Sequence, residues 1–156
     1  MTADYAVTMI GRITTQLKPM PGRSIQEELN ARLALLDGKN RFALLLWRLP
    51  DGVPFDLVDL DTGPTTYIQC AGGVSERFTC EIRRLSADGS PTLEVVGRRT
   101  RDKAPTVRSE AVRWAENETT VQQNEVLDRR ELRELFGSYL ASGEIPASYE
   151  TRPLIP

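Results

Sequence analysis

The sequence predicts a single α+β domain in which an antiparallel sheet of five or six strands carries an N-terminal and a C-terminal helix. Three observations support this fold class. The predicted elements run strand, helix, several strands in hairpin order and helix, which is typical of helices laid on an antiparallel sheet. Each helix begins with a capping box. The 156 residues match the length of one domain, with residues 1–22 as a strand or arm and loop and residues 24–150 as the α+β core.

The first helix is predicted over residues 24–37, after a short strand or extended arm at residues 6–13. Ser24 and Glu27 form a capping box, in which each side chain bonds the other residue's backbone N–H. Apolar residues then recur at helical spacing, at Ile25, Leu29, Leu33 and Leu36. Gly38 stands where this helix should end.

The middle of the chain predicts the strands. Residues 42–47 are continuously apolar, which favours a central strand buried on both faces. Further strands are predicted at residues 65–70, 77–83 and 92–96, and the second of these alternates cleanly between apolar and polar positions. Two weaker strands around residues 112–114 and 119–121 are predicted to form a hairpin.

The last helix is predicted over residues 128–142. Asp128 is its N-cap with Glu131 three residues on. One face carries the apolar residues Leu132, Leu135, Phe136, Tyr139 and Leu140. Gly143 ends the helix, and Pro146 prevents it from resuming.

Composition argues against most enzyme classes. The chain has no histidine, the usual general acid or base near neutral pH and the commonest transition-metal ligand. We therefore expect no enzyme, no cofactor and no catalytic residue, although a carboxylate-dependent enzyme or a small-molecule or metal-binding protein remains the alternative. The formal charge of −2 does not favour nucleic acid or an anionic membrane. Neither a secretory signal nor an apolar span is present, so we expect a cytoplasmic protein.

Cys70 and Cys80 admit two interpretations. A redox or metal pair is disfavoured because no histidine completes a site and no CxxC spacing occurs. We expect two small buried hydrophobic residues on adjacent strands instead. If the two face each other across a hairpin, a disulfide would form only in an oxidising compartment.

Four aspartates stand in a stretch without lysine or arginine, namely Asp51, Asp56, Asp59 and Asp61. Three hypotheses suit them: a solvated loop, an acidic surface that docks a basic partner, and a site for a hard cation. The first is favoured over the second, and the second over the third.

Basic residues concentrate later in the chain, at Arg98, Arg99, Arg101, Lys103, Arg108 and Arg113. We interpret them as a mobile exposed hairpin tip rather than a phosphate site, because aromatic stacking platforms are lacking. Trp47 and Tyr139 are expected in the core by periodicity. Trp114 and Tyr149 lie in polar segments and are expected to be exposed, and Trp114 is a candidate partner-binding residue.

Several segments together resemble a group of uncharacterised small actinobacterial proteins. The segments are residues 42–47, Tyr-Ile-Gln at 67–69, Phe-Thr-Cys-Glu-Ile-Arg at 78–83, and a tail that includes Glu-Val-Leu at 125–127 and Gly-Glu-Ile-Pro at 143–146. Size and style make that group similar to immunity proteins of polymorphic-toxin systems, which bind and block a toxin. The resemblance therefore implies a non-enzymatic protein-binding module whose partner is another protein, such as a basic toxin domain.

Gln69 and Glu81 are the polar residues of the resembling segments. On neighbouring strands they could present hydrogen-bonding groups to a partner. They could equally pair with Arg83 or the backbone on a solvated sheet face, which is the favoured interpretation.

Overall fold

The main sheet of the described residues contains seven strands, and neighbouring strands in it pair antiparallel. The computed structural model describes residues 4–9, 13–60, 64–100 and 108–154. In sheet order the strands are β2 (Ile13–Leu17), β1 (Tyr5–Met9), β3 (Ala43–Arg48), β4 (Tyr67–Gly72), β5 (Phe78–Leu85), β6 (Pro91–Arg98) and β9 (Tyr149–Pro153). The predicted α+β class is confirmed, whereas the expectation of five or six strands is wrong.

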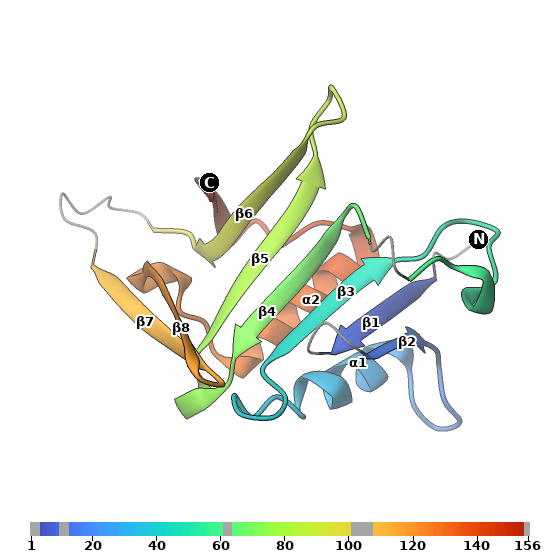
Figure 1. Cartoon of the computed structure of the whole chain (residues 1–156), viewed down its shortest axis with the longest axis horizontal. Helices are drawn as coiled ribbons and strands as arrows, with labels where there is room; N and C mark the ends of the chain where they lie inside the picture. Colours follow the sequence, from blue (N-terminus) through green and yellow to red (C-terminus); the bar gives the residue numbers. More distant parts are fainter. Residues whose placement is uncertain (1–3, 10–12, 61–63, 101–107, 155–156) are drawn as a thin grey trace.

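Two helices cover one face of this sheet. In Figure 1, α1 (Ile25–Leu33) and α2 (Arg129–Ser142) lie behind the strands. Strands β7 (Ser109–Trp114) and β8 (Asn117–Gln122) form the predicted hairpin, but as a separate two-stranded sheet beside the main one. The face away from the helices is therefore only partly covered.

The additional strands lie at the two ends of the sheet. Residues 6–13 were expected to be one strand or arm, but β1 and β2 pair with each other and β1 also pairs with β3. Strand β9 pairs with β6 and has no apolar alternation in its sequence. Its place depends on distant groups: the guanidinium of Arg99 donates to the carbonyls of Ala147 and Tyr149.

Both predicted capping boxes are present. Ser24 and Glu27 bond each other's backbone N–H at the start of α1, and Asp128 and Glu131 do so at α2. Helix α2 ends at Gly143 in the left-handed conformation, as predicted. Helix α1 ends earlier than predicted, because the carboxylate of Asp37 accepts three backbone N–H groups from the turn at residues 39–41.

Arg129 joins the two helices. Its guanidinium donates to the backbone carbonyls of Leu33 and Leu36 and pairs with Glu76 at 2.7 Å. It also lies over the ring of Phe78, 5.0 Å from the ring centroid. The first residue of α2 thus supplies donors to backbone carbonyls at and just after the C-terminal end of α1.

The main core lies between the helices and the sheet. Alternate strand residues point to the helices and are almost fully buried, among them Val7, Leu44, Leu46, Ile68, Cys70, Phe78, Cys80, Ile82 and Val96. Leu29 and Leu33 of α1 and Leu132, Leu135 and Phe136 of α2 complete this cluster. Burial of one such side chain contributes roughly 1.5–3 kcal/mol.

Cys70 and Cys80 are directly opposite each other on β4 and β5, and both are free thiols in the core. The interpretation as two small buried residues on adjacent strands is confirmed. Burial raises the pKa of Cys70 to about 12, and burial with the neighbouring Cys70 raises the pKa of Cys80 well above its ordinary value. The folded chain therefore holds both groups as neutral thiols.

Stability is expected to fall as the pH rises above about 9. An unfolded thiol loses its proton near its ordinary pKa, whereas the folded Cys70 keeps its proton until about pH 12. The folded state then binds more protons, which lowers the free energy of unfolding by about 1.4 kcal/mol per pH unit for each such group. Urea unfolding at a series of alkaline pH values measures this slope. The Cys70→Ala/Cys80→Ala variant should show a shallower slope, and an unchanged slope would contradict the assignment.

Candidate functional site

The acidic loop, residues 50–60, follows β3 and contains η1 (Phe55–Leu57). Phe55 and Val58 anchor it, because both pack against Trp47 and Leu49 on the sheet face away from the helices. Three other large apolar side chains of the loop are exposed: Val53 at 40%, Leu60 at 44% and Leu57 at 72%. A soluble domain rarely leaves neighbouring large apolar side chains in water unless something covers them.

The aspartates of this loop do not converge on one point. Asp51 pairs with Arg48 at 3.0 Å, and both side chains are mostly exposed, so the pair contributes little to stability. Asp56 and Asp59 are exposed, and Asp61 lies outside the described residues. Within the described ranges no group of three acidic or cysteine residues is arranged to hold a metal ion. The loop is therefore an acidic and apolar surface.

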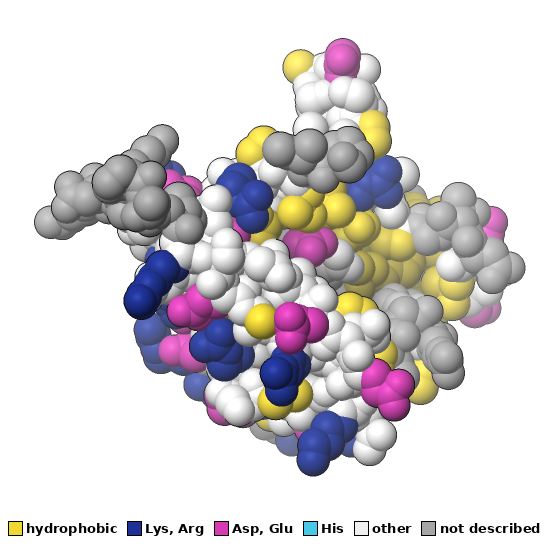
Figure 2. Space-filling model, turned by 60° about the vertical axis from the view of Figure 1, so that its left-hand side comes forward, with side chains coloured by type: hydrophobic (Ala, Val, Ile, Leu, Met, Phe, Trp, Pro, Cys, Tyr) yellow, Lys and Arg dark blue, Asp and Glu magenta, His cyan; other side chains and the backbone are white. Residues whose placement is uncertain are grey.

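We call the sheet surface away from the helices the open face. Over the four central strands it consists of Leu45 and Trp47 of β3, Tyr67 and Gln69 of β4, Glu81 and Arg83 of β5, and Leu93 and Val95 of β6. Val112 and Val121 of the β7–β8 hairpin cover Val95 at one side, and the acidic loop covers Trp47 at the other. Figure 2 shows hydrophobic side chains gathered in a hollow below the β5–β6 turn, with charged side chains at its margin.

Gln69 and Glu81 are cross-strand partners on this face. The amide Nε2 of Gln69 donates to Oε2 of Glu81 at 2.7 Å. Both side chains are partly buried. The predicted neighbourhood of these two residues is confirmed, and they bond each other rather than Arg83.

Trp114 lies away from the acidic loop. Its ring packs against Phe42 with centroids 5.2 Å apart, and its indole N–H donates to Thr119 within the hairpin. Phe42 lies just before β3 and the acidic loop begins just after β3. The length of this strand therefore separates Trp114 from the acidic loop. Trp114 is partly buried rather than free, and Tyr149, which was expected to be exposed, is buried in the main core.

Arg98 and Arg99 of the basic stretch are exposed, as predicted, but hydrogen bonds hold both side chains in place. Arg98 ends β6 and bonds the carboxylate of Glu131, and Arg99 bonds backbone carbonyls. Arg113 of β7 is exposed beside Glu118. Arg101 and Lys103 lie outside the described residues.

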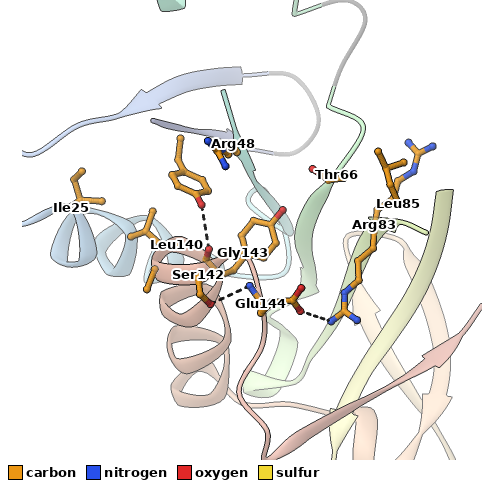
Figure 3. A pocket seen from close by; sticks show the side chains of 13 residues that line it. Ile25, Arg48, Thr66, Arg83, Leu85, Leu140, Ser142, Gly143 and Glu144 are labelled. Atoms are coloured by element: carbon orange, nitrogen blue, oxygen red, sulfur yellow. Dashed lines mark hydrogen bonds and ion pairs between the residues drawn. The ribbon is translucent and has the colours of Figure 1, made fainter. Parts of the chain in front are cut away.

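A cavity of about 800 Å³, which sequence analysis missed, lies at the C-terminal end of α2. Figure 3 shows Ser142, Gly143 and Glu144 on one side and Arg83 and Leu85 of β5 on the other. Its hydroxyl groups include Tyr5, Thr66 and Tyr139, and burial raises the pKa of both tyrosines, which keeps them neutral. Its parts come from segments far apart in the chain, so no local pattern could reveal it.

The charges around this cavity largely compensate one another. Arg84 lies 3.3 Å from Glu144 and 3.7 Å from Glu94, and Arg48 pairs with Asp51 outside the cavity. The Nε of Arg84 is buried without a hydrogen-bond partner among the described residues. The lining therefore offers donors and apolar surface, and of its three arginines Arg83 is the one without an ion pair to a described residue.

Comparisons with known proteins add no relative. No protein-family model, curated protein or solved structure matches this chain. Neither described helix is long and apolar enough to cross a membrane.

Proposed function

We propose that this chain is a non-enzymatic protein-binding module, an immunity-type inhibitor that binds and blocks a basic toxin partner in the cytoplasm. The observation that carries the proposal is the acidic loop, in which exposed apolar side chains alternate with aspartates. Asp56 is followed by Leu57, whose side chain is 72% exposed, and is preceded by Phe55, which packs on the sheet. A rigidly anchored loop of this kind loses little conformational entropy on binding, which favours affinity.

The two components of the loop have different roles in the proposed complex. Apolar side chains at the centre of an interface supply most of the binding free energy once water is excluded. Aspartates around them attract a positively charged partner and raise the association rate, an effect that salt screens. A basic toxin domain with an apolar patch fits both requirements.

Expression of the neighbouring gene tests the function. If the chain is an immunity protein, a toxin gene lies beside its own, and that toxin stops growth of a bacterial expression host. Co-expression of this chain should restore growth, and the two purified proteins should form a complex. A neighbouring product that is harmless, or one whose toxicity persists with this chain present, would overturn the proposal.

Two substitutions in the acidic loop are expected to weaken that complex. Leu57→Ser removes the most exposed apolar contact, and Asp56→Lys reverses a charge, so each should raise the Kd at least tenfold, or about 1.4 kcal/mol. Titration calorimetry with the toxin measures this, and stopped-flow kinetics should show that Asp56→Lys acts mainly on the association rate. Leu35→Ser and Glu116→Lys change exposed side chains elsewhere and should leave the Kd within about twofold. Equal effects of both pairs would contradict the assignment of this loop.

A second function, small-molecule binding, is favoured only by the cavity at the end of α2. Its volume of about 800 Å³ is within the range of ligand sites. A thermal-shift screen over metals and metabolites tests this alternative, because a ligand at 100 times its Kd adds about 2.7 kcal/mol. Stabilisation that Tyr139→Phe abolishes would support the alternative, and the absence of any stabilising compound would count against it.

A further inference from the structure

Glu81 carries a partly buried carboxylate that forms no ion pair with any described residue. Its Oε2 accepts a hydrogen bond from the side-chain amide of Gln69. Arg83 stands two residues further along β5 on the same face, and no ion pair joins it to Glu81 among the described residues. An ionised carboxylate can accept about four hydrogen bonds, so Glu81 has accepting capacity to spare.

The surroundings of Glu81 are mostly apolar. Its neighbour on β6 is Val95, and its neighbour Gln69 on β4 is opposite Leu45 of β3. Tyr67 and Leu93 flank Arg83 on the adjoining strands. A charge on such a surface interacts more strongly with a counter-charge than one in open water, because the surrounding polarity is lower.

The order of the two charges along β5 indicates what they fit. Side chains two residues apart on a strand point to the same side and lie roughly 6.5–7 Å apart. Glu81 and Arg83 therefore leave β5 on the same face, as an anion and a cation two positions apart in the sequence. A partner segment in extended conformation with a basic residue and an acidic residue two positions apart has the same spacing and the complementary order.

We infer that the open face binds an extended segment of the protein partner through an arginine on Glu81 and an acidic side chain on Arg83. Arginine suits this site because its planar guanidinium can donate two hydrogen bonds to one carboxylate, whereas lysine offers a single ammonium group. The inference rests on the proposed protein-binding function and assigns the side chain that the open face recognises.

The probe is the capped tripeptide acetyl-Arg-Ala-Glu-amide, titrated into the ¹⁵N-labelled full chain and followed by NMR. We expect saturable shifts of the Gln69 side-chain amide and of the backbone amides at residues 81–83. The matched control acetyl-citrulline-Ala-Gln-amide keeps the shape of the tripeptide without its charges and should cause no such shifts. Equal shifts with both peptides, shifts confined to other surfaces, or no shifts would overturn the inference.

Variants of the chain separate recognition from folding. Glu81→Gln keeps the hydrogen bond to Gln69 but removes the charge, so it should weaken tripeptide binding at least tenfold without changing the Tm appreciably. Glu116→Gln removes an exposed charge at the hairpin and should bind as the wild type does. If Glu81→Gln fails to fold, Glu81→Asp tests the same point, because it keeps the charge but withdraws it from the partner and should still bind more weakly.

The toxin experiment distinguishes failure of this inference from failure of the proposed function. If the toxin binds Glu81→Gln as tightly as the wild type, the inference is overturned and the immunity function stands. If the tripeptide binds at Glu81 but no neighbouring toxin exists, the recognition site stands and the immunity function is overturned.

Discussion

Arg98→Met is expected to lower the free energy of unfolding by about 2 kcal/mol, because it removes two charge-assisted hydrogen bonds from a carboxylate that is itself buried. The side chain of Glu131 is only 5% exposed, and its two oxygens accept from Nε and a terminal nitrogen of Arg98 at 2.5 and 2.6 Å. One of these oxygens also accepts the backbone N–H of Asp128 in the capping box. Without Arg98 the buried carboxylate loses two of its hydrogen-bond donors and the positive charge beside it.

An exposed pair on the same helix is the control for this prediction. Arg130 lies 3.7 Å from Glu134, and its side chain is 71% exposed. Arg130→Met should therefore cost no more than about 0.5 kcal/mol. Urea unfolding measures both variants, and adding Glu131→Gln to Arg98→Met should recover part of the loss because the stranded charge is then gone. Similar values for Arg98→Met and Arg130→Met would contradict the importance of the pair.

Glu125 is a second buried carboxylate that accepts both a backbone N–H and two donors from one arginine. Its carboxylate accepts the backbone N–H of Gln122 and two donors from Arg152 of β9, at 2.8 and 2.9 Å. Arg98 and Arg152 thus join the last two strands of the sheet to the chain around α2. This explains how β9, which lacks apolar alternation, is held at the edge of the sheet.

What the sequence predicts correctly depends on short-range chemistry. Capping boxes at Ser24 and Asp128 and the alternation around Cys80 are determined by residues three or fewer positions apart. Strand β9 and the pairing of Arg98 depend on residues 27 to 59 positions away, which a single sequence does not relate to each other. The hydrogen bonds of Arg98 were missed for this reason, because composition alone could not show that it has a buried acidic partner.

In the candidate site, too, some features follow from the local sequence and others do not. Composition locates the acidic loop, and the strand motifs locate Gln69 and Glu81. The exposure of Leu57 could not be predicted, because an apolar residue between aspartates can equally point to the core or to water. The absence of an ion pair between Glu81 and Arg83 depends on their side-chain conformations, which the alternation pattern does not determine.

Gly38→Ala is expected to lower the free energy of unfolding by about 3 kcal/mol or more, because steric overlap adds to backbone strain. A Cβ at this position would lie 2.4 Å from the backbone nitrogen of Val74 and 2.7 Å from its Cγ2. A Cβ at Gly73 would in turn lie 2.5 Å from the nitrogen of Gly38, so the two loops touch backbone to backbone. The carbonyl of Gly38 also accepts the N–H of Ala115, which ties the β7–β8 hairpin to the same point.

Gly22 provides a matched control for Gly38. Its φ of +75° is close to the +78° of Gly38, yet nothing lies within 4 Å of a Cβ built there. Gly22→Ala should therefore report the backbone strain alone, about 1 kcal/mol. The difference between the two variants in urea unfolding measures the contact between the loops. If both cost the same, Gly38 is required only for its conformation, and the close approach of the loop after α1 to the β4–β5 turn contributes nothing to stability.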